Sequence, residues 1–244
     1  MKKDIFTILT NEKLAKDVFK MTLQGDTSEI KASGQFVNIE LSGLFLRRPI
    51  SVCDLEGDVL TLIYKTVGEG TEQMSRLSKG DKLDLLTGLG NGYDITKCGE
   101  KLLLAGGGVG VPPLYLLARQ LIKTGKIPSV ILGFNSKEDV FFEDEFKALG
   151  AEVFVTTADG SYGIKGFVTD AIAQIKSWDY SFACGPEAML KAVYDCSEKD
   201  GQFSFEERMG CGFGACMGCS CKTKYGAKRI CVEGPVLEKE EIIW

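Results

Sequence analysis

The chain has 244 residues, of which 44% are hydrophobic and 26% charged, which is the composition of a folded globular protein rather than a disordered one. It contains no histidine, which excludes Ser-His-Asp and Cys-His catalysis, histidine-ligated zinc and Rieske-type clusters. The net charge of −5, without a basic run, argues against a nucleic-acid partner, and no stretch of about 20 mostly apolar residues is present to span a membrane.

Residues 1–98 alternate short β-prone runs with turn-forming Gly-Asp pairs. The expected strands are Asp4–Thr10, Asp17–Gln24, Gln35–Leu41, Asp58–Val67 and Lys82–Leu86. Several short strands at close spacing predict a small antiparallel barrel or sandwich. A short helix is expected over Glu72–Leu77, directly after Gly70-Thr71.

The sequence pattern changes over residues 99–204, where strand-like runs alternate with helical patterns. The strand-like runs are Lys101–Ala105, Ser129–Phe134, Glu152–Thr156 and Tyr180–Ala183. The helical patterns are Pro113–Lys123, Glu138–Leu149, Phe167–Ile175 and Glu187–Glu198. This alternation predicts a parallel sheet with helices on both faces.

A glycine loop, Gly106-Gly107-Gly108-Val109-Gly110, follows the first of these strands and precedes a helix. Such a loop lets a dinucleotide pyrophosphate approach the backbone and the start of the helix. The spacing departs from G-x-G-x-x-G, so a simple tight turn is the alternative. No arginine stands just after the second strand, which favours NAD over NADP.

Five of the nine cysteines fall within 21 residues of a segment, 205–244, that has little helical periodicity. Cys211-x₄-Cys216-x₂-Cys219, followed by Cys231, matches the opening of a plant-type 2Fe–2S site. The interleaved glycines allow tight turns around a cluster, and their N–H groups can point at its sulfurs. The alternative is a Cys₄ zinc ribbon, which prefers two C-x₂-C pairs where this chain has one. Cys221 is expected to be a spare rather than a ligand.

Three short motifs in the β-rich segment suggest a flavin site: Arg48-Pro49-Ile50-Ser51, Ile63-Tyr64-Lys65 and Gly70-Thr71. A guanidinium such as that of Arg48 suits a pyrophosphate, and so do the N–H groups after Gly70-Thr71. Each motif alone also fits an ordinary strand end, core aromatic or turn. Tyr64 in particular either stacks on adenine or flavin, or fills the barrel.

Two of these stretches carry a resemblance to a known family. Arg48-Pro49-x-Ser51 resembles the R-x-[YF]-[ST] signature of ferredoxin-reductase-like flavoproteins, with Ile50 in the place of the aromatic, and Cys184-Gly185-Pro186-x-x-Met189 resembles their C-G-P-x-x-[ML] signature. With the cysteine segment last, the chain is similar over essentially its whole length to the electron-transfer subunits of type B dihydroorotate dehydrogenases, the PyrK family.

The resemblance implies cofactor contacts and metal ligands, but no catalytic side chain. FAD is implied at Arg48, Pro49, Ile50, Ser51, Ile63, Tyr64, Lys65, Gly70 and Thr71. The nicotinamide nucleotide is implied at Gly106, Gly107, Gly108, Gly110, Cys184, Gly185 and Pro186. The 2Fe–2S ligands are implied to be Cys211, Cys216, Cys219 and Cys231. We do not expect Cys184 to be a nucleophile, since no histidine is available to activate it.

The resemblance also implies an architecture and a role. The expected domains are an FAD-binding β barrel over 1–98, an NAD-binding α/β domain over 99–204 and a 2Fe–2S domain over 205–244. The expected partner is an FMN-containing dihydroorotate dehydrogenase subunit, in a cytoplasmic heterotetramer with two copies of each. Electrons would pass from dihydroorotate through the cluster and FAD to NAD⁺ in pyrimidine biosynthesis. The alternatives are a sister flavin/iron–sulfur reductase subunit, linked to NADPH and ferredoxin or to sulfide, and a non-catalytic zinc-stabilised module that senses a nucleotide.

Overall fold

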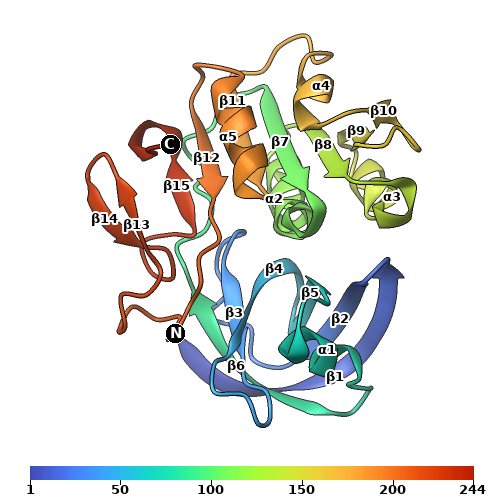
Figure 1. Cartoon of the computed structure of the whole chain (residues 1–244). Helices are drawn as coiled ribbons and strands as arrows, with labels where there is room; N and C mark the ends of the chain where they lie inside the picture. Colours follow the sequence, from blue (N-terminus) through green and yellow to red (C-terminus); the bar gives the residue numbers. More distant parts are fainter.

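The computed structural model describes residues 1–244 and contains a β barrel, a layered α/β unit and a C-terminal segment beside both (Figure 1). The barrel is closed and antiparallel, in the order β1-β2-β5-β4-β3-β6. Its strands are β1 (Lys2–Ala15), β2 (Val18–Gln24), β3 (Phe36–Ile39), β4 (Arg48–Glu56), β5 (Val59–Lys65) and β6 (Lys82–Leu89). The predicted antiparallel barrel is therefore confirmed.

Alternation along the strands fills the barrel. In β6, Leu83 and Leu85 are buried while Lys82 is exposed and Asp84 only half-buried, as expected for a sheet with one apolar face. The strand β4 was not among the expected ones, because it starts with Arg-Pro and its burial does not alternate, with an irregular register between Val52 and Asp54. The short helix α1 (Glu69–Ser75) begins three residues earlier than expected and closes one side of the barrel.

The second unit is built on a seven-stranded sheet in the order β10-β9-β8-β7-β11-β12-β15. Its strands are β7 (Leu102–Gly107), β8 (Ser129–Phe134), β9 (Glu152–Thr157), β10 (Ile164–Lys165), β11 (Tyr180–Cys184), β12 (Gly201–Ser204) and β15 (Val236–Glu238). All neighbours are parallel except β12 and β15. The predicted parallel sheet is confirmed, and the C-terminal segment adds an antiparallel edge to it.

Helices cover both faces of this sheet, as predicted. They are α2 (Val111–Lys123), α3 (Glu143–Ala148), α4 (Val168–Ile172) and α5 (Glu187–Asp195). Leu102 and Leu104 pack in one core with α2, whereas Leu103 and Ala105 pack in another with α4 and α5. The helix expected over Glu138–Leu149 is shorter, because a 3₁₀ turn over Lys137–Asp139 precedes it and Phe142, at φ 68°, leaves the helical region.

The barrel and the α/β unit meet through α2. This helix lies against β4, and its Arg119 forms an ion pair of 2.8 Å with Asp54 of that strand, where both side chains are largely buried. Val18, Cys53 and Ile63 of the barrel join Val111 in one apolar core across the contact. Apolar burial and a shielded ion pair therefore fix the two units in one arrangement.

The C-terminal segment carries a small hairpin, β13 (Ser220–Thr223) and β14 (Gly226–Arg229), followed by β15 and a 3₁₀ turn over Lys239–Glu241. The chain's last residue, Trp244, packs against Tyr194 and Phe205, with ring centroids 5.8 and 5.5 Å away. None of the helices is both long enough and apolar enough to cross a bilayer.

Candidate functional site

The glycine loop lies where the strand order of the α/β sheet reverses. From β7 the chain moves outward through β8, β9 and β10, and it then returns to add β11 on the other side of β7. Ligands of open α/β sheets bind beyond the carboxyl ends of the strands at such a switch point. The carboxyl ends here are Gly106-Gly107 of β7 and Cys184 of β11, with Gly106 and Cys184 paired directly.

The two nucleotide motifs, far apart in the sequence, touch at this point. A Cβ added at Gly110 would lie 2.6 Å from the Cα of Gly185 and closer still to the carbonyl of Cys184. A Cβ added at Gly107 would lie 2.5 Å from the sulfur of Met189. Glycine is therefore required for the close approach of these segments.

Cys184 is 3% exposed, and its thiol is held neutral. Burial first, and then the nearby charge of Glu206, raise its pKa to about 12. A neutral buried thiol is a poor nucleophile. Cys184 itself packs in the core at the switch point.

The flavin motifs come together at one side of the barrel. The guanidinium of Arg48, on β4, lies over Gly70 of α1, where a Cβ would sit 2.9 Å from Cζ. Arg48 forms no ion pair, so its charge is available to a phosphate. The Thr71 hydroxyl accepts the N–H of Val67 at 2.9 Å and shapes the turn, which leaves its backbone as the ligand-facing group.

Tyr64 is enclosed within the barrel. Its side chain is 2% exposed, it stacks on Phe19 with centroids 5.7 Å apart, and its hydroxyl donates to Asn11 at 2.9 Å. Burial raises the pKa of this hydroxyl to about 12. Tyr64 therefore fills the barrel.

The two half-sites face each other. Strand β5, which carries Ile63–Lys65, contacts the 3₁₀ turn Gly108–Gly110 of the glycine loop. Strand β4, which begins with Arg48–Ser51, contacts α2, the helix that follows that loop, and Arg119 of α2 meets Asp54 and Leu55 in the later part of the strand. The arrangement places a flavin-type motif beside a dinucleotide-type motif, as hydride transfer between two cofactors requires.

The cysteine loop supplies sulfur atoms that already accept backbone hydrogen bonds. Cys219 and Cys231 are each 2% exposed, Cys211 is half-buried and Cys216 is exposed. N–H groups donate to Cys211 from Ala215 at 3.2 Å, to Cys216 from Gly218 at 3.5 Å and to Cys219 from Cys231 at 3.4 Å. Burial opposes ionisation of Cys211, yet backbone donors, Phe213 first among them, lower its pKa to about 6.

These features fit an iron–sulfur cluster. Thiolate donors with N–H groups aimed at sulfur are the usual surroundings of such clusters. Gly212 and Gly214 take positive φ values of 77° and 90°, which the loop needs for its turns. No three Cys, Asp or Glu side chains converge closely enough to hold a single metal ion. The cysteines therefore match a cluster site in donor type and loop geometry, but they do not already surround one metal position.

Comparison with known proteins identifies the family. Residues 206–243 match the family model of the iron–sulfur cluster binding domain of dihydroorotate dehydrogenase B. The chain is 45% identical to the dihydroorotate dehydrogenase B (NAD(+)) electron transfer subunit of Bacillus pumilus, covering 99% of this chain and 98% of the relative. The same subunit of Fusobacterium nucleatum is also 45% identical, covering 97% and 96%. This chain belongs to the family of dihydroorotate dehydrogenase B electron transfer subunits.

Solved structures place the family in a wider fold. A chain of an NADH-dependent reduced ferredoxin-NADP oxidoreductase aligns with a TM-score of 0.90 and 32% identity, covering 98% of this chain and 90% of the other. Phthalate dioxygenase reductase aligns with a TM-score of 0.69 over 90% of this chain at 18% identity, which shows the shared fold. The iron–sulfur segment and the ferredoxin-reductase-like architecture expected from the sequence are thus confirmed.

Met189, the last residue of the C-G-P-x-x-[ML] stretch, packs on both Gly107 and Gly185. One further residue near the site was not singled out from the sequence. Asn38 reaches the cysteine loop across 173 residues of chain. Its only sequence signal is a polar residue within the otherwise apolar run Phe36–Ile39.

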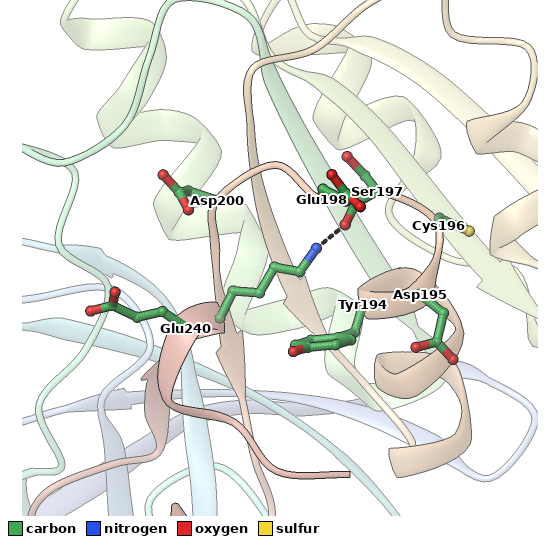
Figure 2. Close-up of a pocket in the computed structure, with 8 residues that line it drawn as sticks. Tyr194, Asp195, Cys196, Ser197, Glu198, Asp200 and Glu240 are labelled. Atoms are coloured by element: carbon green, nitrogen blue, oxygen red, sulfur yellow. Dashed lines mark hydrogen bonds between the residues drawn. The ribbon is translucent and has the colours of Figure 1, made fainter. Parts of the chain in front are cut away.

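A pocket of about 640 Å³ lies elsewhere, at the end of α5, and none of the motif residues line it (Figure 2). Its lining is mostly charged, and burial lowers the pKa of Lys239, whose amino group donates to the Ser197 carbonyl. Asp195 and Cys196 point away from the other labelled side chains. The acidic groups do not converge, so this pocket adds nothing to the site.

Proposed function

We propose that this chain carries electrons between a catalytic partner subunit and NAD⁺. In this proposal, an FMN-containing subunit oxidises dihydroorotate to orotate in pyrimidine biosynthesis, and two copies of each subunit form a cytoplasmic heterotetramer. The observation that carries the proposal is the contact of the flavin strands β4 and β5 with the glycine loop and α2, in a chain 45% identical over nearly its full length to named electron transfer subunits.

The proposed cofactor residues divide among three units, with boundaries at 98/99 and 204/205. FAD would be held by Arg48–Ser51, Ile63–Lys65 and Gly70-Thr71. NAD would be held by Gly106–Gly110 and Cys184–Pro186. The cluster would be held by Cys211, Cys216, Cys219 and Cys231. When bound, FAD exchanges a hydride with the nicotinamide and single electrons with the cluster.

The chain's own residues would bind and orient the cofactors. Arg48 and the backbone of Gly70-Thr71 supply positive charge and N–H donors to a pyrophosphate. The buried Cys184 thiol and the contact of Met189 with Gly107 would give the proposed nucleotide site an apolar side. Hydride transfer between two cofactors needs no side-chain base, which fits a chain without histidine.

Apolar side chains around the cysteine loop favour a catalytic partner that docks there. Phe213 and Met217 are 46% and 56% exposed. Apolar groups left exposed beside a redox centre are typical of a protein interface. Docking there would also bring the partner's cofactor close to the cluster.

A second candidate is the sister reductase, favoured by the TM-score of 0.90 to the ferredoxin-NADP oxidoreductase chain. Identity is lower there, at 32% against 45%. Under this alternative the chain pairs with another partner and works with NADPH and ferredoxin rather than with dihydroorotate.

The test is co-expression with the dihydroorotate dehydrogenase catalytic subunit of the same genome, followed by purification of the complex and assay. We expect a stable complex that reduces NAD⁺ with dihydroorotate, whereas the catalytic subunit alone does not. The proposal fails if the chain forms no such complex, or if the complex reacts with NADPH and ferredoxin but not with dihydroorotate.

A further inference from the structure

Strand β3 is buried on both faces, which is unusual for a barrel strand with one side toward solvent. Val37 and Ile39 point into the barrel core. Phe36 packs instead in the core that contains Cys219 and Cys231. Because side chains alternate along a strand, Asn38 lies on the outer face with Phe36. It is 1% exposed beneath the cysteine loop.

Asn38 contacts both proposed redox sites. Its amide nitrogen donates to the carbonyl of Cys211 at 3.4 Å. A Cβ at Gly212 would collide with the same nitrogen, so the loop backbone rests directly on it. Across the ladder, Asn38 pairs with Pro49 of the flavin motif. Asn38 therefore lies in the strand next to the flavin motif, and its side chain contacts the loop at the first proposed cluster cysteine.

The barrel holds Asn38 firmly in this place. Arg47 donates to the Asn38 backbone carbonyl at 3.2 Å and to the backbone carbonyl of Asp84 at 3.1 Å. The Arg47 guanidinium also pairs with the Asp84 carboxylate at 2.8 Å. Strands β3, β4 and β6 are thereby locked together at the level of Asn38, so a shift of its side chain would be passed to the loop rather than absorbed by the barrel.

Stability alone does not explain an asparagine here. Its Oδ1 is buried and has no hydrogen-bond partner. An unsatisfied buried acceptor is unfavourable, and a leucine of similar size would avoid that cost. The chain therefore keeps a polar residue at a position where an apolar one would fit.

We infer that Asn38 is a positioning residue for electron transfer, which sets how the Cys211 end of the cluster loop sits against the flavin strand. The inference rests on the proposed function, since it assigns a role between the two redox sites of that proposal. It also predicts a local effect that can be measured without turnover: loss of the amide donor frees the backbone of residues 210–214.

The test compares three variants of the full chain, purified anaerobically. Asn38→Leu keeps the size and removes the donor, and Asn38→Asp keeps the shape and replaces the donor with an acceptor. Asn91→Leu is the matched control, because Asn91 also joins the C-terminal segment to the body, donating to Val236 at 2.7 Å, but touches neither the flavin strand nor a cysteine ligand.

Stopped-flow reduction with NADH separates flavin reduction from the later reduction of the cluster. We expect both Asn38 variants to leave the flavin phase nearly unchanged and to slow the cluster phase several-fold, because electron transfer weakens as the two redox sites move apart. Amide hydrogen exchange at residues 210–214 should rise, and the electron paramagnetic resonance spectrum of the reduced cluster should change. Asn91→Leu should lower thermal stability and leave the cluster phase unchanged.

Two results would overturn the inference: a wild-type cluster phase with unchanged exchange in both Asn38 variants, or equal slowing in Asn91→Leu. If Asn38→Asp does not fold, the leucine variant carries the test. A wild-type protein without flavin and iron–sulfur absorption would instead defeat the proposed function. Hydrogen exchange at residues 210–214 would still report whether Asn38 tethers the loop.

Discussion

The nucleotide site and the cysteine loop are built in different ways. At the switch point, Gly110 and Gly107 press against Cys184–Pro186 and Met189, and apolar cores close both faces of the sheet. The loop over 210–219 is instead largely exposed and keeps its shape through glycines, N–H···S bonds and the guanidinium of Arg229, which donates to the Gly214 carbonyl at 2.9 Å.

The difference concerns what completes each site. At the switch point, packing holds the proposed nucleotide-binding residues in place. The cysteine loop is more exposed, and we expect a bound cluster to add to its order. One site is therefore sensitive to added volume, and the other to lost ligands.

The largest effect expected is from Cys219→Ser. This proposed ligand is buried, and its loss should abolish the cluster and loosen residues 206–243, while NAD⁺ binding at the switch point persists. Iron content, visible absorption and hydrogen exchange would measure this. Cys221→Ser is the control and should keep full iron content, because we expect Cys221 to be no ligand. Equal loss of iron in both variants would contradict the proposed ligand set.

Gly110→Ala adds volume at the proposed nucleotide site, whereas Cys219→Ser removes a proposed ligand from the cysteine loop. The new methyl would meet backbone atoms of Cys184 and Gly185 that cannot move aside. Overpacking of this kind costs about 1–3 kcal/mol of unfolding free energy, and NAD⁺ affinity should fall at least about tenfold. Gly68→Ala, where a Cβ meets nothing within 4 Å, should leave NAD⁺ affinity unchanged. Calorimetric unfolding and NAD⁺ titration provide the comparison, and unchanged NAD⁺ binding in Gly110→Ala would count against this site.

Arg48→Ala tests whether the charge of Arg48 serves FAD binding rather than the stability of the barrel. Arg48 has no acidic partner, so its loss should weaken FAD by about 1.5–3 kcal/mol, the value of a hydrogen bond to a charged group, with little change in apoprotein stability. Arg47→Ala should instead lower the stability of the apoprotein and leave FAD affinity little changed, because Arg47 pairs with Glu40 and Asp84 on the barrel. FAD titration of the apoproteins, with thermal unfolding alongside, would show whether the two arginines divide the roles in this way.

The smallest effect expected is a pH dependence that comes from the switch point. Burial raises the pKa of Cys184 to about 12, so the folded protein keeps its proton while the unfolded chain loses it near pH 8.5. Stability should therefore be full below about pH 8.5 and fall above it, by up to about 1.4 kcal/mol per pH unit for one group. Cys184→Ala should flatten the decline measured by denaturant unfolding from pH 7 to 10. A steeper decline in the variant would contradict the neutral buried thiol.

The sequence predicts the fold and the motif positions well, because they depend on local pattern. Short β-prone runs separated by turns predict the barrel, and the alternation of strand and helix patterns from residue 99 predicts the parallel sheet. The cysteine spacing predicts the iron–sulfur segment. These features depend on neighbours within a few residues of one another, where periodicity and turn chemistry are informative.

The parts that the sequence does not predict depend on contacts across long stretches of chain. The edge strand β15 joins the nucleotide sheet through β12, although its three residues carry no strand pattern of their own. Tyr64 belongs to the barrel because Asn11 and Phe19 enclose it, which no local signal shows. The contact of Asn38 with the cysteine loop is visible only in the folded structure, because the two are 173 residues apart in the sequence.

The central claim is that NADH, flavin and cluster form one electron path within this chain. Its most direct test is an anaerobic titration of the purified protein with NADH, followed by ultraviolet–visible absorption and electron paramagnetic resonance. The account predicts flavin and 2Fe–2S bands that both bleach, with a reduced-cluster signal appearing. A protein that stays colourless after reconstitution with FAD, iron and sulfide, or a flavin that NADH reduces without any electron reaching the cluster, would contradict it.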